Sequence, residues 1–290
     1  MEEPFPFRLI ITSRCNGKCG FCHNEGNQTQ IDMPLQLIAD SISASQSLGL
    51  KTISISGGEP CLHPSFSNIL RLIEHGKING VSFSITSNGL TLIKYRKEID
   101  LLFYSISCSV FSLDKKIWSK YTGINPNQVI NILHHIKIDK EINILVNEDN
   151  YQEIGALISV CEQNLINMKF MVKVPLDEQS ELMQKYILKY FYSHYQNINL
   201  LKKDNRYYLS LSSGKIQIRI NIPLISKLQN LARCESCVYY EKCGEYVCAT
   251  RLYPNGKISN CLNNHVFITD YKSLLLGINE LSNLMNRWES

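Results

Sequence analysis

Short apolar strands and amphipathic helices alternate along the first 175 residues. Six segments have the length and composition of buried strands, at residues 7–12, 51–56, 81–87, 101–110, 141–147 and 168–174. Segments with apolar residues at helical spacing lie between most of them, at 34–48, 65–76 (with Gly76 as the stop), 126–138 and 151–165. The alternation predicts βαβ units, a parallel sheet and an α/β fold, with functional residues at the carboxyl ends of the strands. It fits a partial barrel and a doubly wound sheet equally well.

The pattern changes after residue 175. A tyrosine-rich helix is predicted at 180–195, and the alternating residues 206–220 predict a β-hairpin that turns at Ser213-Gly214. A cysteine-rich segment follows, and the last predicted element is a helix at about 271–287. We therefore expect a core of residues 1–200 and an extension of residues 201–290.

Composition and charge narrow the class of protein. The chain of 290 residues is 44% hydrophobic and 19% charged, which suits one large α/β domain or such a domain with a small appendage. The net charge of +4 comes from scattered residues, so we expect an ordinary solvated surface and no nucleic-acid partner. No apolar run is long enough to span a membrane, and the N-terminus is acidic where a signal peptide is basic. We expect a cytoplasmic protein.

Eleven cysteines are many for a reducing compartment, where disulfides are rare, so clustered cysteines predict metal ligands. Cys15, Cys19 and Cys22 have the spacing C-x₃-C-x₂-C on one short segment. Three such thiolates can bind three irons of a [4Fe–4S] cluster and leave the fourth iron open. A zinc site with His23 as a further ligand is the alternative. Three other cysteines stand alone and are expected to be small core residues: Cys61, Cys108 and Cys161.

This spacing resembles that of the radical S-adenosylmethionine (SAM) superfamily. Two later segments are similar to further motifs of that family: Ser56-Gly57-Gly58-Glu59-Pro60 to its GGEP motif, and Thr86-Ser87-Asn88-Gly89 to its T-N-G segment, here with a serine inserted. The resemblance implies that the open iron binds the amino and carboxylate groups of SAM. It also implies that one electron cleaves SAM to a 5′-deoxyadenosyl radical, which takes a hydrogen atom from the substrate.

The resemblance implies SAM contacts at the ends of several strands. Glu59 is expected to accept a hydrogen bond from the SAM ammonium, and a serine of the fourth strand to lie near the ribose or the substrate, although the family's aspartate is missing there. Arg14 or Arg8 corresponds to an arginine of the family. His23 and Glu25 either face the site or form hydrogen bonds with the backbone of their own loop. The implied cofactor-binding residues are Phe21, Gly57, Gly58, Glu59, Pro60, Ser87, Asn88, Ser107 and Ser109.

A second group of cysteines lies within residues 234–261. In a chain that already carries an iron–sulfur motif, this density predicts a second cluster, with structural zinc as the alternative. The segment resembles the end of GTP 3′,8-cyclases, which have a hairpin, a C-x₂-C pair, an N-R-L-R segment and a last cysteine followed by leucine. The corresponding residues here are Cys234, Cys237, Arg251-Leu252, Asn255-Gly256-Lys257 and Cys261-Leu262.

The cyclase-like resemblance runs from residue 7 to about 262 and implies a partial TIM barrel, (βα)₆, with a small cluster-binding extension. It implies substrate contacts from Arg251 and Tyr253, although Tyr253 replaces the family's second arginine. Inserted residues supply a candidate fourth cysteine ligand, for which Cys243 is preferred over Cys248. A fourth ligand would occupy the open iron of the auxiliary cluster and make the cluster an electron relay. The auxiliary ligands implied are Cys234, Cys237, Cys243 and Cys261. The family's Gly-Gly tail is absent, which argues against a true GTP cyclase.

Two enzyme hypotheses follow from the resemblance. The first is a radical SAM enzyme that acts on a small molecule, with a nucleotide as one candidate, and takes electrons from a donor such as flavodoxin or ferredoxin. The second is a peptide-modifying maturase with a twitch-type auxiliary cluster. The short stretch before residue 7 leaves no room for the peptide-binding domain that many maturases carry, which favours the small molecule. A non-catalytic metal-binding module is disfavoured by the GGEP segment.

Overall fold

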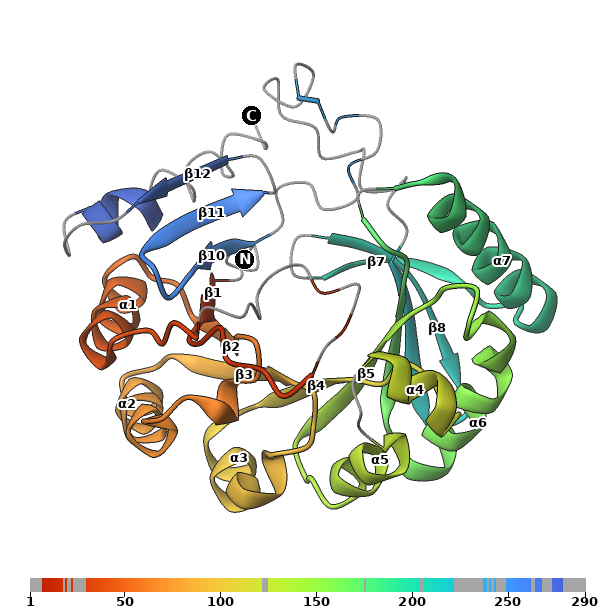
Figure 1. Ribbon diagram of the computed structural model, residues 1–290, viewed down its shortest axis with the longest axis horizontal. Helices are drawn as coiled ribbons and strands as arrows, with labels where there is room; N and C mark the ends of the chain where they lie inside the picture. The colour runs from red at the N-terminus through yellow and green to blue at the C-terminus, as the bar shows by residue number, and fades with distance from the viewer. Residues whose placement is uncertain are drawn as a thin grey trace.

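The computed structural model describes residues 7–121 except 18, 20, 21 and 23–29, residues 125–221 except 175, 204 and 205, positions 237, 238, 240 and 243, and residues 249–261, 264–267 and 273–278. Within these residues a 12-stranded sheet has the order β12-β11-β10-β1-β2-β3-β4-β5-β6-β9-β8-β7. The sheet curves around a central axis, and the helices cover its outer side (Figure 1).

Six βα units form the core of the fold, as the alternation predicts. They are β1 (Phe7–Ile10) with α1 (Leu35–Ser47), β2 (Thr52–Ser56) with α2 (Phe66–Ile78), β3 (Ser82–Ser87) with α3 (Arg96–Leu102), β4 (Ser105–Ser109) with α4 (Lys115–Tyr121) and α5 (Pro126–His134), β5 (Asp139–Leu145) with α6 (Ile154–Asn164), and β6 (Asn167–Met171) with α7 (Glu178–His194). Short 3₁₀ turns occupy Pro60–Leu62, Leu92–Tyr95 and Tyr151–Glu153. Strands β1 to β6 pair in parallel. The predicted α/β fold with a partial barrel is confirmed.

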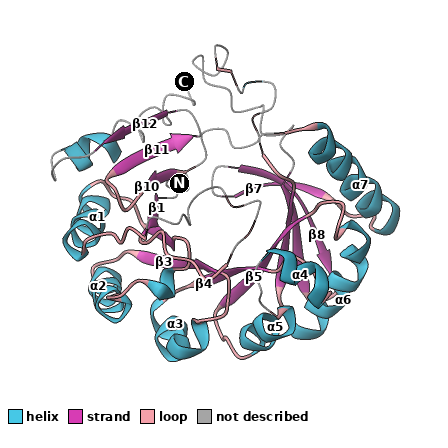
Figure 2. Cartoon of the chain, viewed as in Figure 1, coloured by secondary structure: helices cyan, strands magenta, loops and turns pink. Residues whose placement is uncertain are grey.

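Strands from the last third of the chain extend the sheet at both edges. They are β7 (Asn199–Lys203), β8 (Arg206–Ser213), β9 (Ile216–Asn221), β10 (Thr250–Leu252), β11 (Lys257–Cys261) and β12 (Asn264–Phe267). Strand β9 pairs in parallel with β6, and β10 pairs in parallel with β1. Helices lie outside and strands inside along the described chain (Figure 2). The division of the chain near residue 200 stays a prediction.

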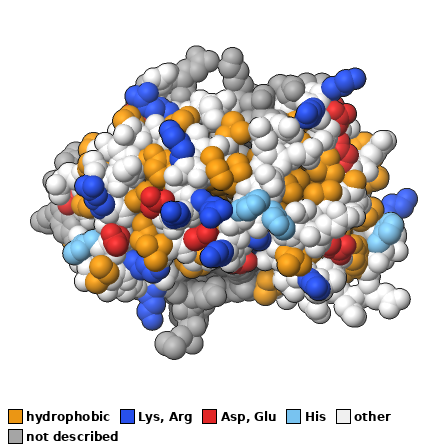
Figure 3. All heavy atoms as spheres, turned by 90° about the horizontal axis from the view of Figure 1, so that it is seen from below, with side chains coloured by type: hydrophobic (Ala, Val, Ile, Leu, Met, Phe, Trp, Pro, Cys, Tyr) orange, Lys and Arg blue, Asp and Glu red, His pale blue; other side chains and the backbone are white. Residues whose placement is uncertain are grey.

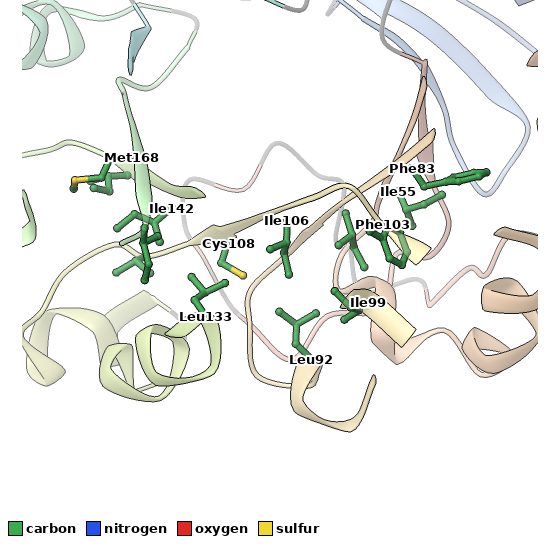
Figure 4. Packing of buried hydrophobic residues seen from close by; sticks show 14 of the residues in the cluster. Ile55, Phe83, Leu92, Ile99, Phe103, Ile106, Cys108, Leu133, Ile142 and Met168 are labelled. Carbon is green, nitrogen blue, oxygen red and sulfur yellow. The ribbon is translucent and has the colours of Figure 1, made fainter. Parts of the chain in front are cut away.

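The parallel strands have an apolar outer face and a polar inner face. On β4, Ile106 and Cys108 are buried and point from the sheet towards Leu92, Ile99 and Leu133 (Figure 4). The alternate positions of the same strand are the less buried serines 105, 107 and 109. Closed TIM barrels fill this inner side with branched apolar side chains. A polar inner face is instead suited to holding a ligand.

Two predicted boundaries were wrong, each for a packing reason. Gly76 does not end α2, which continues to Ile78. A Cβ atom at Gly76 would lie 2.9 Å from both Ile42 Cγ2 and Phe83 Cζ, so the glycine allows α2 to approach α1 and β3 closely. The predicted strand at 101–110 begins only at Ser105, because residues 96–102 form α3 and bury Ile99 and Leu102 against the sheet.

The hairpin and the lone cysteines agree closely with expectation. The hairpin turns at Gly214 and residue 215, one position later than predicted, and Gly214 has a φ of 56° that favours glycine. Residues 273–278 are helical, inside the predicted C-terminal helix. The three lone cysteines are buried in the core, as expected: Cys61, Cys108 and Cys161.

The described helices contain no membrane span, and the face shown in Figure 3 has no single charged patch. No helix among the described residues combines the length and the apolar composition needed to cross a bilayer. Lysine and arginine side chains are dispersed among other residue types on the face shown in Figure 3. The scattered charge therefore matches the pattern seen in the sequence.

Candidate functional site

The cysteine loop follows the carboxyl end of β1, and its two ends are clamped together. Thr12 and Asp32 form an isolated antiparallel bridge, in which Thr12 Oγ1 donates a hydrogen bond to Asp32 at 2.6 Å. Ser13 N–H donates to the carbonyl of Ile31, and Ile31 N–H donates to Ser13 Oγ, both at 2.8 Å. The Arg14 guanidinium lies 2.9 Å from Asp32. These contacts fix the base of the loop independently of what the loop binds.

Three cysteine thiols of this loop lie near one another. An ideal Cβ placed on Gly17 would be 3.5 Å from Cys15 Sγ and 3.6 Å from Cys19 Sγ, so the two sulfurs flank this glycine. Gly17 N–H donates to Cys15 Sγ at 3.3 Å, and Cys22 N–H donates to the Cys19 carbonyl at 3.1 Å. Burial, followed by the charges of Cys15 and Cys22, raises the pKa of Cys19 to about 12. The effect of Cys15 and Cys22 on Cys19 is consistent with the closeness of the three thiols.

The donor set fits an iron–sulfur cluster better than a single ion. Each cluster thiolate binds a different iron, so the three sulfurs need not converge on one point. Among the residues that the structure describes, no three histidine, cysteine, aspartate or glutamate side chains converge as ligands of one metal ion. Burial also raises the pKa of Cys15, so the thiols of Cys15 and Cys19 are protonated without metal, and metal binding at these two cysteines would release protons.

The Gly-Gly pair after β2 packs directly on the start of the cysteine loop. Gly58 N–H donates to the Thr12 carbonyl at 2.7 Å, and Glu59 N–H donates to the Arg14 carbonyl at 2.6 Å. A Cβ on Gly57 would lie 2.7 Å from Thr12 O, and one on Gly58 only 2.3 Å from Arg14 O. Both glycines are therefore needed for this backbone contact, whatever further contact they make with a ligand.

Glu59 connects the ends of β2 and β3. Its side chain is completely buried, and its two oxygens accept hydrogen bonds from Ser87 Oγ, at 2.8 and 3.0 Å. Asn88 N–H donates to Oε2 at 2.8 Å, and Thr91 Oγ1 and Cys61 N–H lie 3.2 and 3.4 Å from Oε1. Burial raises the pKa of Glu59, and these donors oppose that shift. Both oxygens already accept protein donors, and the expected hydrogen bond from the SAM ammonium stays a prediction.

Asn88 completes the contact between the three motifs. Its Nδ2 donates to Asn16 Oδ1 at 2.6 Å and lies 4.0 Å from Cys15 Sγ. Gly89 follows with a φ of 93°, a conformation that L side chains rarely adopt. The cysteine loop, the GGEP segment and the turn after β3 therefore meet at the carboxyl ends of three neighbouring parallel strands, where the fold places a ligand site.

Comparison with protein families agrees with this geometry. The model of the radical SAM superfamily matches residues 9–160, which include the cysteine loop and both later motifs. The chain belongs to the radical SAM superfamily. It is therefore a radical SAM enzyme, and membership implies a [4Fe–4S] cluster and SAM as cofactors.

Curated relatives carry the name of one group within the superfamily. A probable GTP 3′,8-cyclase of Methanococcus aeolicus is 26% identical over 253 residues, which cover 79% of each chain. A probable GTP 3′,8-cyclase of Pyrococcus horikoshii is 24% identical over 277 residues, covering 88% of this chain and 82% of the relative. The resemblance to cyclase-like enzymes seen in the sequence is confirmed at this modest identity.

Solved structures of radical SAM enzymes share the fold over nearly the whole chain. Streptococcus suis SuiB bound to S-adenosylmethionine has a TM-score of 0.66 and 17% identity, over 93% of this chain and 64% of SuiB. Native anSMEcpe with bound AdoMet and the Cp18Cys peptide has a TM-score of 0.63 and 15% identity, over 95% of this chain and 82% of that one. The present chain thus spans about two thirds of the length of SuiB.

The remaining predicted residues of the core lie on the inner face or at its rim. Ser107 and Ser109 are on the inner face of β4, and Ser107 is the pairing partner of Thr86. Arg251, on β10, is 8% exposed and pairs in register with Arg8. Tyr253 follows β10, with the Lys257 ammonium 5.8 Å from its ring centre. Pro60 starts the 3₁₀ turn after β2 and is buried.

The predicted auxiliary site is only partly described. Cys237 and Cys243 are half-buried, and the backbone of Cys261 ends β11. Five further predicted residues lie outside the described residues: Phe21, His23, Glu25, Cys234 and Cys248. The auxiliary ligand set therefore stays a prediction.

Some residues of the site were not predicted from the sequence. Thr91 donates a hydrogen bond to Glu59, and Asn16 accepts one from Asn88. No sequence motif marks Thr91 or Asn16. Two charged residues on the inner faces of strands, Lys169 and Arg219, could have been found from the sequence, because each stands between two buried apolar residues of its strand. Glu141 was not marked in this way, because it follows Lys140. Alternation of this kind predicts a polar inner face.

Replacing Glu59 with glutamine is expected to lower the free energy of unfolding by about 1–3 kcal/mol. In the wild type, buried donors face both carboxylate oxygens of Glu59. Glutamine replaces one of these oxygens with an NH₂ group, so at least one buried donor loses its acceptor. Anaerobic denaturant unfolding of the reconstituted protein measures the change. Glu178→Gln, at an exposed position in the first turn of α7, is the matched control and should shift stability by less than about 0.5 kcal/mol. Equal stability of the two variants would contradict the role given to Glu59.

Proposed function

We propose that Cys15, Cys19 and Cys22 hold the [4Fe–4S] cluster of this enzyme, and that it cleaves SAM reductively to abstract a hydrogen atom from a small-molecule substrate. The observation that carries this proposal is the convergence of three thiols, the GGEP segment and Asn88 at one end of the sheet. When bound, the cluster supplies an open iron for SAM and the single electron that breaks its S–C5′ bond.

The chain's own residues position the cofactor. The backbone contact at Gly57 and Gly58 holds the loop start against β2, and Glu59 holds the turn after β3 against the same strand. Asn88, beside Cys15, is placed to hydrogen-bond a ligand next to the cluster. Ser107 and Ser109 lie on the inner face, where the SAM ribose or the substrate would be bound.

We also propose an auxiliary cluster in the C-terminal extension, held by Cys234, Cys237, Cys243 and Cys261. The density of cysteines and the likeness to cyclase-like enzymes support it. Arg251 and Tyr253 lie on β10 and at its carboxyl end, beside β1, and would contact the substrate from that edge. With four protein ligands the auxiliary cluster would have no open iron for substrate. Its role would then be to relay electrons from a donor such as flavodoxin or ferredoxin.

Two substrate classes follow from the comparisons. The relatives named as probable GTP 3′,8-cyclases make GTP the first compound to test. A peptide is the second candidate, because crystal structures of anSMEcpe with a bound peptide and of SuiB with its precursor peptide SuiA share the fold over 95% and 94% of this chain.

Anaerobic reconstitution with iron and sulfide tests the proposal. With SAM and dithionite, the protein is expected to form 5′-deoxyadenosine and to contain about eight irons per chain, four for each cluster. Chromatographic quantification of 5′-deoxyadenosine, with and without GTP, then tests the nucleotide. Zinc in place of iron, or absence of 5′-deoxyadenosine, would overturn the proposed function, and turnover independent of GTP would remove only the nucleotide substrate.

A further inference from the structure

A second polar group lies on the inner face of β5, β6 and β9, away from the cysteine loop. Asn143 on β5 pairs in register with Lys169 on β6, and Lys169 pairs with Arg219 on β9. Glu141 and Asn221 lie two positions away on the same faces of β5 and β9. The intervening residues are buried in the apolar core: Ile142, Ile144, Met168, Phe170, Ile218 and Ile220. We call the five polar residues the inner-face row.

The row carries both signs of charge. Glu141 Oε2 accepts a hydrogen bond from Arg219 Nε at 2.9 Å, and Lys169 Nζ lies 3.5 Å from Glu141 Oε1. The side chains of Glu141, Arg219 and Lys169 are 9%, 13% and 19% exposed. The Arg219 guanidinium also lies 5.1 Å from the ring centre of Tyr208 on β8. Two cations and one anion give the row a net charge of +1. The carboxylate of Glu141 contacts both cations.

Two carboxamide oxygen atoms in the row accept no hydrogen bond from the residues that the structure describes. Asn221 is 8% exposed, and its buried Oδ1 has no partner among the described residues. The buried Oδ1 of Asn143 also has none there. Buried polar atoms in folded proteins are nearly always paired with protein, water or a ligand. Each of the two carboxamides therefore marks a position on the inner face where a bound molecule can supply a hydrogen-bond donor.

One end of the row lies at the same end of the sheet as the cysteine loop. Strand β9 runs parallel to β6 and ends at Asn221, so Asn221 is at the same end of the sheet as the cysteine loop. Strand β8, the partner of β9, lies across the curve of the sheet from β1 (Figure 1). A molecule bound on the row would therefore face the three cysteines across the inner side of the sheet.

We infer that the inner-face row is the substrate anchor and that it takes an amino-acid-like group, a carboxylate with a neighbouring N–H donor. Lys169 and Arg219 are the residue types that bind a carboxylate, and the oxygens of Asn143 and Asn221 accept N–H donors. Glu141 already neutralises one of the two cations, so the remaining charge of +1 matches one carboxylate and not a polyphosphate. This inference rests on the proposed function, which places the substrate on the inner face.

A free amino acid and the carboxylate of a peptide share this chemistry. Four probes separate the sources: L-alanine, N-acetyl-L-alanine, N-acetyl-L-alanine methylamide and inorganic tripolyphosphate. Ligand-observed NMR of the reconstituted protein under anaerobic conditions, with saturating SAM to occupy the cofactor site, measures their dissociation constants. We expect N-acetyl-L-alanine to bind and the methylamide and tripolyphosphate not to bind. Tighter binding of L-alanine would assign a free amino acid, and weaker binding a peptide carboxylate.

Variants assign the binding to the row. Lys169→Met is expected to weaken N-acetyl-L-alanine binding roughly tenfold or more, and Lys169→Arg to restore most of it. Asn221→Leu is expected to weaken binding roughly threefold or more, through loss of the acceptor. Lys189→Met, at an exposed position on the outer helix α7, is the matched control and should bind as the wild type does. Because Lys169→Arg keeps the positive charge, it tests the anchor even where methionine disturbs folding.

The anchor and the proposed function fail in different ways. If the wild-type protein forms no 5′-deoxyadenosine from SAM, the proposed function is wrong, whether or not the probes bind. Three other results would overturn the anchor while leaving SAM cleavage in place. They are equal binding of N-acetyl-L-alanine by the wild type and Lys169→Met, preferential binding of tripolyphosphate, and no binding of either carboxylate probe.

Discussion

Replacement of Cys19 by alanine should abolish reductive cleavage of SAM and remove about four irons per chain. Cys19 is the middle of three thiols: its sulfur and that of Cys15 flank Gly17, and its carbonyl accepts a hydrogen bond from Cys22 N–H. Two remaining thiolates would leave two irons without protein ligands. Iron quantification, the cluster's visible absorbance and 5′-deoxyadenosine formation measure the loss in the reconstituted protein.

The control for this variant is another cysteine. Cys161 is completely buried in α6, remote from the loop, so Cys161→Ala should keep the iron content and the cleavage of SAM at the cost of some stability. If Cys19→Ala still formed 5′-deoxyadenosine at the wild-type rate, the assignment of the three cysteines would be wrong. A loss shared equally by both variants would indicate general damage to the fold.

Replacement of Gly58 by alanine should lower the free energy of unfolding by about 3 kcal/mol or more and weaken SAM binding. The new Cβ would lie 2.3 Å from the Arg14 carbonyl oxygen and 2.7 Å from its carbon. Because these are backbone atoms, no side-chain rotation relieves the collision. The hydrogen bonds from Gly58 N–H to Thr12 and from Glu59 N–H to Arg14 would be strained or lost. Anaerobic unfolding and SAM titration measure the two effects.

Gly155 provides the matched glycine. A Cβ there meets only the hydroxyl end of Tyr190, at 3.0 Å, and alanine is favoured over glycine in a helix. Gly155→Ala should therefore be neutral or slightly stabilising. A Gly58→Ala protein as stable as Gly155→Ala, with unchanged SAM affinity, would show that the loop does not depend on this contact.

The sequence predicted the parts of the fold that depend on local pattern. Strand and helix alternation placed the six strands and most of the helices between them, because each of these elements shows its own period. Helix α3 was missed, because no helix was predicted between the third and fourth strands. The strand predicted over 101–110 began too early, since the apolar run from Leu101 to Tyr104 does not reveal where α3 ends. The pairing of β10 with β1 could not be read from any period, because it joins residues near opposite ends of the chain.

The candidate site was predictable to a similar degree. Spacing alone identified the three cysteines, and the Gly-Gly pair was identified as a place of close backbone approach. The sequence could not show that this approach includes Thr12 and Arg14, or that Glu59 binds Ser87 and Asn88, because those contacts are made between separate loops. The mixed charge of the inner-face row likewise appears only when three strands are placed side by side.

The pairing of Phe7 with Thr250 has a consequence for biosynthesis. During translation, one edge of β1 lacks its neighbouring strand until β10 has emerged from the ribosome. Unpaired strand edges invite association with other chains, and distant pairings form slowly. The nascent chain therefore has an unpaired strand edge while residues between β1 and β10 are being synthesised, and chaperones or a low rate of expression should improve its yield.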